Sequence, residues 1–572
     1  MRHVLGINSA YHESAACLLR DGVLVAFAEE ERFNRRKHGK LARVDNPDEL
    51  PRQAIQFCLR QAGINLGSVE SIGYSFDPPL HLRNAGLGEP VGSIDWGSRD
   101  GEELFQARLR AIPEAIAEMA GAQVSDRFHW IEHHLCHAAS AFLVSPFEEA
   151  AVLAVDGIGE FGTAWLGHGH GVQLRKLGEL EYPHSLGFLW EKLAEFLGFG
   201  PYDACKVMAL AAYGDPRTFA PAFHKLVSSA GQAEVRLAAD ILRFRTENFG
   251  PLESLLGPRR PPGEALTARH FDIAAALQHA TDDALLALAS ALRRQTGSSR
   301  LCLAGGVALN CLSNRALHQS GLFEELYIQP AAHDAGTALG AAAWLWCRQL
   351  AGDRRFVLEH PYLGPEYSEA EIIAALQRSG LRYRRSSAPA AEAATLIAGG
   401  AVTGWFQGRM ELGPRALGNR SLLADPRRPE MRAVLNAKVK HRESFQPFAP
   451  AVLAERAADW FRIPGRSRAS DFMLLACEAR PERAALIPAV VHADGTSRIQ
   501  TVRAETNPLF YRLIAEFERQ TGVPLVLNTS FNDSEPIVCS PRDALRTFCH
   551  TRIDALLLGD FVVERQEAPQ VT

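Results

Sequence analysis

The sequence of 572 residues is longer than a single hydrophobic core usually supports, so we expect two or three domains. Hydrophobic residues make up 47% and charged residues 22%, a balance that excludes disordered and fibrous proteins and is typical of globular ones. The formal net charge of -5 gives no overall attraction to nucleic acid or to an anionic membrane surface, so we expect neither as a partner.

The first elements of the chain are short apolar stretches separated by turn residues. Residues 4–8, 14–19 and 22–31 follow this pattern, which predicts a β-meander. A second meander is predicted over residues 150–160, 163–169 and 172–180. The repetition of the unit predicts a duplicated architecture.

Amphipathic helices are predicted between and after these strands. Apolar residues recur at intervals of three and four over residues 103–120 and 271–295, and further strands are predicted within residues 299–310 and 326–336. Strands covered by such helices are typical of the α/β class.

Two domains joined by a linker are predicted from the distribution of these elements. The first domain is expected over residues 1–350. Residues 351–367 contain glycine, proline and charged residues in irregular order, and they are the predicted linker. The second domain is expected over residues 368–572, beginning with a helix.

Cysteine usage and the N-terminus indicate a cytoplasmic protein. The ten cysteines include no C-x-x-C pair, so neither a disulfide framework nor a thiolate zinc site is predicted. His3, Asn8, His12 and Glu13 interrupt the first apolar stretch, which argues against a signal peptide. No segment reads as long and apolar enough to span a bilayer.

The sequence EHHLCHAASAF predicts a helix that carries His133 and His137 four residues apart, and therefore on one face. Two imidazoles in this arrangement can ligate a divalent metal when carboxylates complete the site. Asp156 and Asp334 are the candidates, because each is predicted to end an apolar strand and precedes glycine. A helix whose histidines face solvent explains the pair equally well, and His134, on another face, is expected to be structural.

Gly305 and Gly306 follow a predicted strand, where a backbone without side chains can approach a nucleotide closely. A packing turn is the commoner reason for two glycines at such a place. Asn8, His12 and Ser14 in the first hairpin can meet phosphate in the same way, although an ordinary turn accounts for them as well.

The second half of the chain contains many cations close to glycines, which favours a basic cleft for a phosphorylated ligand. A solvated surface is the alternative for part of the set. The cations are Arg409, Arg415, Arg420, Arg427, Arg428, Lys438, Lys440, Arg442, Arg498 and Arg503. Further on, Asn528, Ser530 and Asn532 end a predicted strand, where they can contact a ligand.

Taken together, these motifs resemble the family of O-carbamoyltransferases that modify antibiotics and nodulation factors. The resemblance extends over nearly the whole length and rests on a set of motifs in fixed order: AFAEEERFNRRKHG, EHHLCHAASAF, AVDGIGEFGTA, KVMALAAYG, AGGVALN, HDAGTALGAA, GRMELGPRALGNRS, VKHRESFQPFAP and VLNTSFN. It implies a first domain with the duplicated fold of actin, Hsp70 and sugar kinases. It also implies an α+β second domain resembling the synthase of threonylcarbamoyl adenylate.

The resemblance also implies roles for individual residues. The family's metal ligands correspond to His133, His137, Asp156 and Asp334. The pocket for carbamoyl phosphate and ATP corresponds to Arg415, Lys440, Arg442, Arg498, Asn528 and Ser530, with Lys440 and Arg498 in catalysis. In the first domain, nucleotide or substrate contacts are expected at Asn8, Lys37, Gly305, Gly306 and Asn310. His12 is the candidate for positioning or deprotonating the acceptor hydroxyl, because it lies in the first hairpin close to the predicted phosphate site. The chain departs from the family pattern at Ala204 and Cys205, which leaves contacts of the acceptor pocket open.

The implied reaction is an ATP-dependent carbamoyl transfer in two steps, of the kind used in antibiotic biosynthesis and secondary metabolism. Carbamoyl phosphate and ATP form carbamoyl adenylate, and the carbamoyl group then moves to a hydroxyl of a small molecule. The expected cofactors are ATP, Mg²⁺ and one transition-metal ion, Fe(II), Mn(II) or Zn(II), and a homodimer is the commonest assembly of soluble enzymes.

Two other functions remain open from the sequence. An enzyme of the tRNA threonylcarbamoyl type would share both folds, but the net negative charge weighs against it. A non-catalytic actin-like ATPase is the second alternative, and the motifs of the anion pocket weigh against that.

Overall fold

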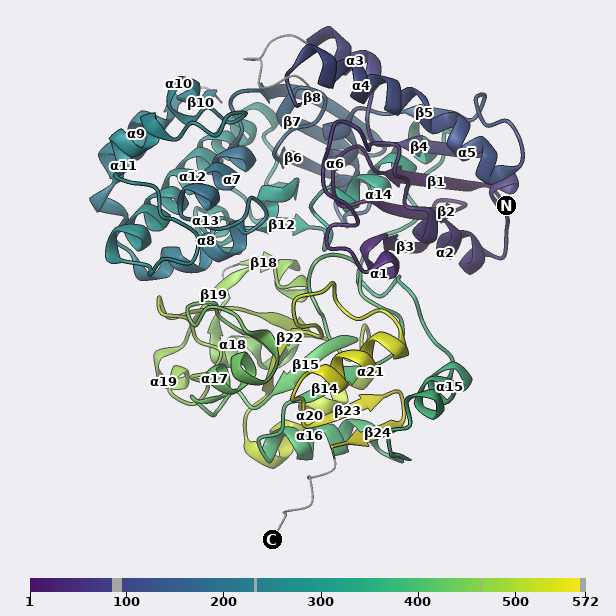
Figure 1. Ribbon diagram of the computed structural model, residues 1–572, viewed down its shortest axis with the longest axis vertical. Coiled ribbons are helices and arrows are strands. Elements are labelled where there is room, and N and C mark those ends of the chain that lie inside the picture. Colours follow the sequence, from purple (N-terminus) through teal and green to yellow (C-terminus); the bar gives the residue numbers. More distant parts are fainter. Residues whose placement is uncertain (85–94, 231–233, 464, 566–572) are drawn as a thin grey trace. The chain divides into compact units, whose positions relative to one another are not determined.

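The computed structural model describes residues 1–84, 95–230, 234–463 and 465–565 (Figure 1). The chain divides into two compact units. Unit 1 consists of Met1–Leu358 and Gly465–Ala469, and unit 2 consists of Glu359–Pro464 and Ser470–Thr572. The first division falls after Leu358, and the predicted linker and domain bounds stay predictions. Sequence reasoning did not anticipate that residues 465–469 belong to the first unit.

The first sheet of unit 1 has the strand order β3-β2-β1-β4-β5. Its strands are β1 (His3–Asn8), β2 (Ala15–Arg20), β3 (Val23–Glu29), β4 (Ser71–Tyr74) and β5 (Phe128–Trp130). Strand β2 is antiparallel to β1 and β3, while β4 is parallel to β1 and β5. The predicted β-meander is therefore confirmed as one side of a mixed sheet.

The second sheet of unit 1 repeats this order and these directions, as β8-β7-β6-β11-β12, with β18 added at the edge. Its strands are β6 (Glu149–Val155), β7 (Gly162–His170), β8 (Gln173–Glu181), β11 (Arg300–Ala304), β12 (Glu325–Ile328) and β18 (Arg466–Ser467). Two sheets with the same topology confirm the predicted duplicated α/β architecture.

Two helices, α6 (His133–Phe142) and α14 (Ala335–Trp344), pack against each other between the sheets. Helix α14 lies on β1, β2 and β4, and α6 lies on β6, β7 and β11. Close approach depends on small residues: a Cβ at Gly340 would overlap the carbonyl oxygen of Cys136 in α6, and one at Gly6 would overlap that of Ala338. Each sheet is thus covered by a helix that begins near the proposed ligands.

The remaining helices of unit 1 lie outside this central layer. They are α1 (Glu31–Asn34), α2 (Arg52–Ala62), α3 (Pro78–Asn84), α4 (Arg99–Arg110), α5 (Ile112–Ala120), α7 (Leu186–Phe196), α8 (Ala204–Leu210), α9 (Ala220–Leu226), α10 (Ala239–Leu242), α11 (Gly250–Leu256), α12 (Ala268–Thr296) and α13 (Cys311–Gln319). A two-stranded sheet, β9 (Val227–Ala230) and β10 (Glu234–Leu237), accompanies them. The predicted long helices over residues 103–120 and 271–295 correspond to α4 with α5 and to α12.

Unit 2 is built on an eight-stranded mixed sheet in the order β13-β24-β23-β14-β15-β22-β16-β21. These strands are β13 (Tyr383–Arg385), β14 (Thr403–Phe406), β15 (Arg420–Ala424), β16 (Ala449–Leu453), β21 (Gln500–Val502), β22 (Leu525–Ser530), β23 (Ala555–Leu558) and β24 (Phe561–Glu564). A smaller sheet contains β17 (Phe461–Arg462), β19 (Ala476–Ala479) and β20 (Thr496–Arg498).

The helices of unit 2 flank these strands, which makes it a second unit of α and β structure. They are α15 (Glu369–Ser379), α16 (Pro389–Ala398), α17 (Met431–Leu435), α18 (Ala457–Trp460), α19 (Pro481–Ala484), α20 (Pro508–Thr521) and α21 (Pro541–His550). The predicted likeness of this unit to the synthase of threonylcarbamoyl adenylate stays a prediction.

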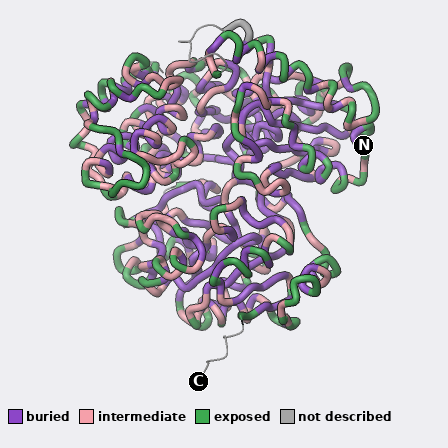
Figure 2. The backbone as a smooth tube through the Cα atoms, in the orientation of Figure 1, coloured by how far each residue is buried: buried purple, intermediate pink, exposed green. Residues whose placement is uncertain are grey.

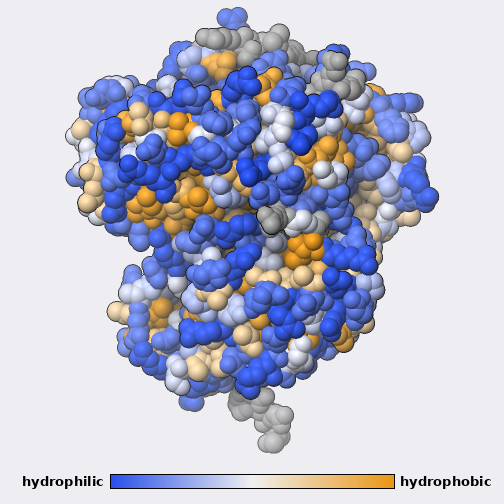
Figure 3. All heavy atoms as spheres, turned by 180° about the vertical axis from the view of Figure 1, so that it is seen from behind, coloured by the Kyte–Doolittle hydropathy of each residue, from blue (hydrophilic) through white to orange (hydrophobic). Residues whose placement is uncertain are grey.

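Burial follows the layers of each unit. Nearly all residues of α6 and α14 are buried, as are most residues of the strands on which they pack (Figure 2). On the face of the molecule seen in Figure 3, hydrophilic residues cover most of each unit and hydrophobic residues appear in separate groups. The four proposed metal ligands, His133, His137, Asp156 and Asp334, are therefore polar groups inside an apolar interior.

Candidate functional site

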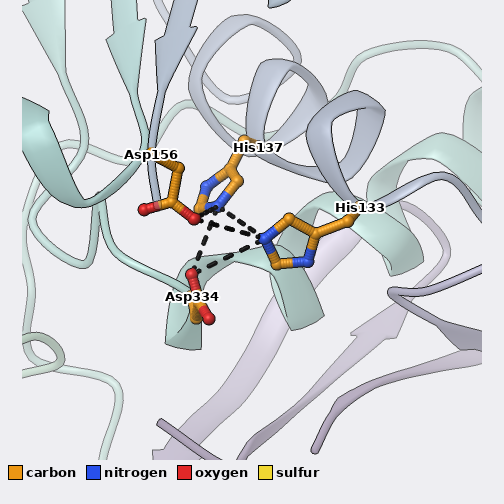
Figure 4. A group of neighbouring side chains, drawn as sticks. All are labelled: His133, His137, Asp156 and Asp334. Carbon is orange, nitrogen blue, oxygen red and sulfur yellow. Dashed lines mark hydrogen bonds and ion pairs between the residues drawn. The ribbon is translucent and has the colours of Figure 1, made fainter. Parts of the chain in front are cut away.

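Four buried side chains of unit 1 come together at one point: His133, His137, Asp156 and Asp334 (Figure 4). The two histidines lie one turn apart on α6. Asp156 directly follows β6, and Asp334 is the residue before α14. The sequence prediction that these four residues share a location is thus met by the geometry.

The donor atoms are spaced as metal ligands are. Nε2 of His137 lies 3.1 Å from Nε2 of His133, 3.3 Å from Oδ2 of Asp156 and 3.4 Å from Oδ1 of Asp334. Nε2 of His133 lies 3.4 Å and 3.6 Å from the same two oxygens. Tetrahedral ligands held about 2.0–2.2 Å from an ion are separated by about 3.3–3.6 Å. The spacing therefore suggests a site for one metal ion.

Hydrogen bonds orient the first histidine. The backbone N–H of His133 donates to the carboxylate of Glu160 at 2.9 Å, and its Nδ1 lies 3.2 Å from the carbonyl oxygen of Ser75. Because a carbonyl can only accept, Nδ1 carries a hydrogen, and Nε2 is the ring nitrogen that faces the cluster. Glu160 and Ser75 were not predicted, since their contribution depends on contacts with residues far away in the chain.

The backbone after β11 holds Asp156. The N–H of Gly306 donates to Oδ1 of Asp156 at 2.8 Å, which leaves Oδ2 for the cluster. Gly305 has φ 86°, and a Cβ there would overlap the carbonyl oxygen of Val155. Gly306, one of the two glycines predicted to approach a nucleotide, thus orients the carboxylate of Asp156.

Asp334 does not end a strand, contrary to the sequence-based expectation. Strand β12 ends at Ile328, and the intervening loop leads to α14 with Asp334 at its N-cap position. The N-terminus of a helix carries unpaired N–H groups and favours a negative charge. The helix rather than the strand therefore places this carboxylate.

The four groups shift each other's pKa strongly. Burial alone would lower the pKa of His133, but attraction to Asp334 and contacts with Asp156 hold it well above its ordinary value. Burial would raise the pKa of Asp156, but its contacts with His133 and His137 bring it well below the usual range. Neighbouring His134 is buried beside these histidines, and its pKa is lowered well below the ordinary value. The cluster thus contains carboxylate anions that need a positive partner, either protons on the histidines or a metal ion.

The chemistry of the donors suits a divalent transition metal. Two imidazole nitrogens and two carboxylate oxygens form a mixed set that Fe(II), Mn(II) and Zn(II) all accept, and two negative charges balance the ion. The set does not distinguish among these metals.

Among the other predicted residues of unit 1, His12 lies beside this cluster. Nδ1 of His12 lies 3.9 Å from Oδ2 of Asp334. Asn8 is buried, and its amide donates to the carbonyl oxygens of His12 and Glu13 and accepts from the hydroxyl of Ser75. Its side chain is therefore engaged in hydrogen bonds within the protein.

Two further residues of unit 1, Asn310 and Lys37, were predicted to contact the nucleotide or substrate. Asn310 caps α13 by accepting from the N–H groups of Leu312 and Ser313, and it donates to Gln278. This capping role explains the residue without a ligand. Lys37 is exposed.

In unit 2, a hydrogen-bond chain orients Asn528. Gln500 donates to the carbonyl oxygen of Leu417 at 2.7 Å, so its own oxygen faces Nδ2 of Asn528, 2.8 Å away. Nδ2 of Asn528 also donates to the carbonyl oxygen of Ala416. Among the described residues, the buried Oδ1 of Asn528 has no hydrogen-bond partner, so it remains as an acceptor.

Lys440 is buried and surrounded by oxygen acceptors. Its Nζ donates to the carbonyl oxygen and hydroxyl of Ser530 at 2.5 and 3.1 Å, and to the carbonyl and side-chain oxygens of Asn532 at 2.9 and 2.6 Å. Lys440 and Ser530 therefore come together at the end of β22. Arg415, Arg442 and Arg498 are partly exposed, and Nε of Arg498 has no hydrogen-bond partner within the described part of the chain.

Several predicted cations of unit 2 are engaged in internal contacts instead. Arg420 is wholly buried and donates to five backbone carbonyl oxygens. Arg427 and Arg428 pair with Asp425, Lys438 pairs with Asp554, Arg503 pairs with Asp471, and Arg409 donates to Gly364. The sequence alone does not separate these residues from ligand-binding ones, because their partners are distant in sequence.

No helix among the described residues combines the length and apolar character needed to cross a membrane.

Comparison with known proteins relates both units to one family. Residues 3–77 and 102–343 match the family part described as Carbamoyltransferase N-terminus, and residues 394–565 match Carbamoyltransferase C-terminus. The chain is 39% identical to the uncharacterized protein sll1178 of Synechocystis sp., covering 100% of this chain and 98% of that one. It is 38% identical to nodulation protein NolNO of Sinorhizobium fredii, covering 98% and 80%, and 31% identical to nodulation protein U of Rhizobium tropici, covering 91% and 89%.

Solved structures are more distant. Component A of (R)-2-hydroxyglutaryl-CoA dehydratase from Acidaminococcus fermentans is 16% identical with a TM-score of 0.35, covering 60% of this chain and 97% of that one. HypF of T. kodakarensis is 14% identical with a TM-score of 0.32, covering 61% and 48%. These TM-scores are too low to assign a fold, and the duplicated architecture of unit 1 rests on the strand order of its two sheets. Because the family match extends over most of both units, the chain belongs to the carbamoyltransferase family and is an enzyme of that family.

Proposed function

We propose that this chain is an ATP-dependent O-carbamoyltransferase that modifies a hydroxyl of a small molecule. The observation that carries the proposal is the buried cluster of two histidines and two aspartates in a chain that matches the carbamoyltransferase family in both of its parts. Unit 1 performs transfer, and unit 2 performs activation.

Activation begins with carbamoyl phosphate in unit 2. Hydrolysis releases phosphate and leaves carbamate, whose oxygen attacks the α-phosphorus of ATP and expels pyrophosphate, with Mg²⁺ accompanying the nucleotide. Arg415, Arg442 and Arg498 are the cations that stabilise the phosphate charges. Lys440 holds Ser530 and the end of β22, and the preset oxygen of Asn528 suits an N–H donor such as the carbamoyl amino group.

Transfer uses the cluster of unit 1. His133, His137, Asp156 and Asp334 would hold a divalent ion, which would supply Lewis-acid chemistry there. The acceptor oxygen forms a bond to the carbamoyl carbon, the bond from that carbon to the AMP oxygen breaks, and His12 takes the hydroxyl proton. Gly305, Gly306 and exposed Lys37 are the proposed contacts of the nucleotide, and the N–H of Gly306 also donates to Asp156.

The proposal is tested with purified protein, ATP, radiolabelled carbamoyl phosphate and a panel of hydroxyl compounds including sugars and antibiotic precursors. We expect ATP cleavage that requires carbamoyl phosphate and yields AMP and pyrophosphate, and a mass increase of one carbamoyl group on an acceptor. Formation of ADP, or cleavage without carbamoyl phosphate, would refute it and favour an actin-like ATPase.

A tRNA-modifying enzyme is the second candidate class, and the same assay separates it. Carbamoylation of a small molecule in the absence of RNA supports the first proposal. An activity that appears only with threonine, bicarbonate and tRNA would show the alternative instead. Homodimerisation also stays a prediction, to be checked by light scattering.

A further inference from the structure

Two residues near the cluster, Glu13 and His38, have left-handed backbones although neither is glycine. Their φ angles are 56° and 63°. They also bind each other twice: the N–H of Glu13 donates to the carbonyl oxygen of His38 at 2.8 Å, and Nδ1 of His38 lies 2.5 Å from Oε1 of Glu13. Left-handed conformations of such residues are unfavourable and persist where the surroundings require them, often at functional sites.

The carboxylate of Glu13 also reaches the segment of a proposed metal ligand. Its second oxygen, Oε2, lies 3.7 Å from Nε2 of His333, the residue before Asp334. His333 lies equally far from Oε1 of Glu29, which is paired with Arg32. Burial alone would raise the pKa of Glu13, but His333 and His38 hold it below the usual range, so the group is an anion between two histidines. Glu13 therefore joins the first hairpin to the loop of His38 and to the start of α14.

His12 is next to Glu13 in the chain and lies beside Asp334. Oδ1 of Asp334 faces the two histidines of the cluster, while Oδ2 lies 3.9 Å from Nδ1 of His12. The backbone of this turn is held by Asn8, which donates to the carbonyl oxygens of His12 and Glu13 at 3.3 and 3.0 Å. The position of the His12 ring relative to Asp334 thus depends on how the residue 12–13 turn is tied to the residue 333–334 segment.

We propose that Glu13 is a positioning residue that, by binding His38 and His333, holds His12 at the outer oxygen of Asp334, where His12 serves carbamoyl transfer. The inference rests on the proposed function for the role of His12, but the geometric part stands on its own. Glu13 is not one of the four proposed metal ligands, and it acts through His12.

The direct test is the crystal structure of three metal-loaded variants. In Glu13→Ala the separation between Nδ1 of His12 and Oδ2 of Asp334 should increase from 3.9 Å by about 1 Å or more, a displacement large enough to impair catalysis. In Glu13→Gln the separation should be retained, because the amide oxygen still accepts from Nδ1–H of His38. An unchanged separation in Glu13→Ala would overturn the inference.

Glu13→Gly separates positioning from folding stability. Glycine adopts φ near 56° without strain, so this variant should melt no lower than Glu13→Ala while displacing His12 equally. Glu149→Ala is the control for the loss of a carboxylate–histidine contact elsewhere, because Oε1 of Glu149 lies 2.7 Å from Nε2 of His168. Glu149 is the first residue of β6, and Asp156 follows the other end of that strand. Its His12 to Asp334 separation should match that of the parent protein.

A double-mutant cycle tests whether Glu13 acts through His12. With chemically prepared carbamoyl adenylate and a panel of methyl glycosides as acceptors, Glu13→Ala should lower kcat of transfer about 100-fold and leave adenylate formation unchanged. When Glu13→Ala is added to His12→Ala, kcat of transfer should fall by less than about twofold relative to His12→Ala alone, because the residue that Glu13 positions is already absent. Independent, multiplying losses would overturn the inference. If the parent protein forms no carbamate ester, the proposed function fails, whereas the crystal structures still decide the positioning.

Discussion

Replacing His137 with alanine should abolish metal binding and carbamoyl transfer while carbamoyl adenylate still forms. His137 is fully buried, and its Nε2 lies within 3.1–3.4 Å of the other three donors. Alanine removes one of four ligands and offers no replacement. Because the cluster belongs to unit 1 alone, activation in unit 2 should be independent of it.

The size of the effect follows from the surroundings of the ring. Loss of groups that merely support a ligand lowers metal affinity about 10- to 100-fold, so loss of a ligand should exceed about 100-fold. In the parent protein, metal ion at a free concentration of 100 times its Kd stabilises the folded state by about 2.7 kcal/mol. The variant should lack this stabilisation. Without metal, Asp156 and Asp334 would share His133 alone, and breaking a buried ion pair costs about 3–5 kcal/mol.

The assay combines metal content after dialysis, melting temperature with and without added metal, and carbamoyl phosphate-dependent pyrophosphate release. His134→Ala is a matched control, because His134 is a buried histidine on the same helix that lies outside the donor set. The control should keep the ion and the melting shift that the ion causes.

Retention of one equivalent of ion and of a parent-like melting shift by His137→Ala would refute the ligand assignment. Equal loss of pyrophosphate release and transfer in a folded variant would instead refute the division of labour between the two units.

Three further predictions concern pH, activation and packing. Metal affinity should rise with pH, because the pKa of His133 in the metal-free protein is raised and a proton occupies its Nε2 at pH values below that pKa. In metal titrations the association constant should increase about tenfold per pH unit for each proton displaced. The increase should level off above the pKa of His133. Arg498→Ala should slow adenylation ten- to a thousandfold, roughly 1.5 to 4 kcal/mol, while ready-made carbamoyl adenylate restores transfer; a variant equally inactive with the adenylate would assign Arg498 to transfer or folding. Gly340→Ala should destabilise unit 1 by about 1–3 kcal/mol in urea unfolding, since its Cβ would overlap the Cys136 carbonyl, and an unchanged midpoint would contradict the close packing of α6 and α14.

The local order of residues was sufficient to predict much of unit 1. A spacing of four puts His133 and His137 on one helical face wherever the helix lies, and alternation with turn residues predicts each β-meander. These features depend on neighbours within a few residues. For the same reason, the motifs in fixed order were enough to identify the family, which the family match confirms.

Contacts between distant segments decide which of the predicted cations are engaged within the fold and which remain available to a ligand. The same arginine-rich run contains Arg415 at the predicted pocket and Arg420, which is buried against carbonyl oxygens that include those of Cys539 and Pro365. Whether a cation stabilises the fold or remains available to a ligand depends on such partners, which local patterns do not specify.

The surroundings of the metal cluster were likewise decided by tertiary structure. Asp334 is placed by the start of α14 rather than by a strand end, and Glu160 orients His133 across a gap of 27 residues. In the sequence, Glu13 is only one of the polar residues that interrupt the first apolar stretch. Its backbone angle and its contacts with His38 and His333 are visible only in the structure. Ligand identity is a local chemical property of a side chain, whereas its orientation depends on hydrogen bonds and packing that exist only in the folded chain.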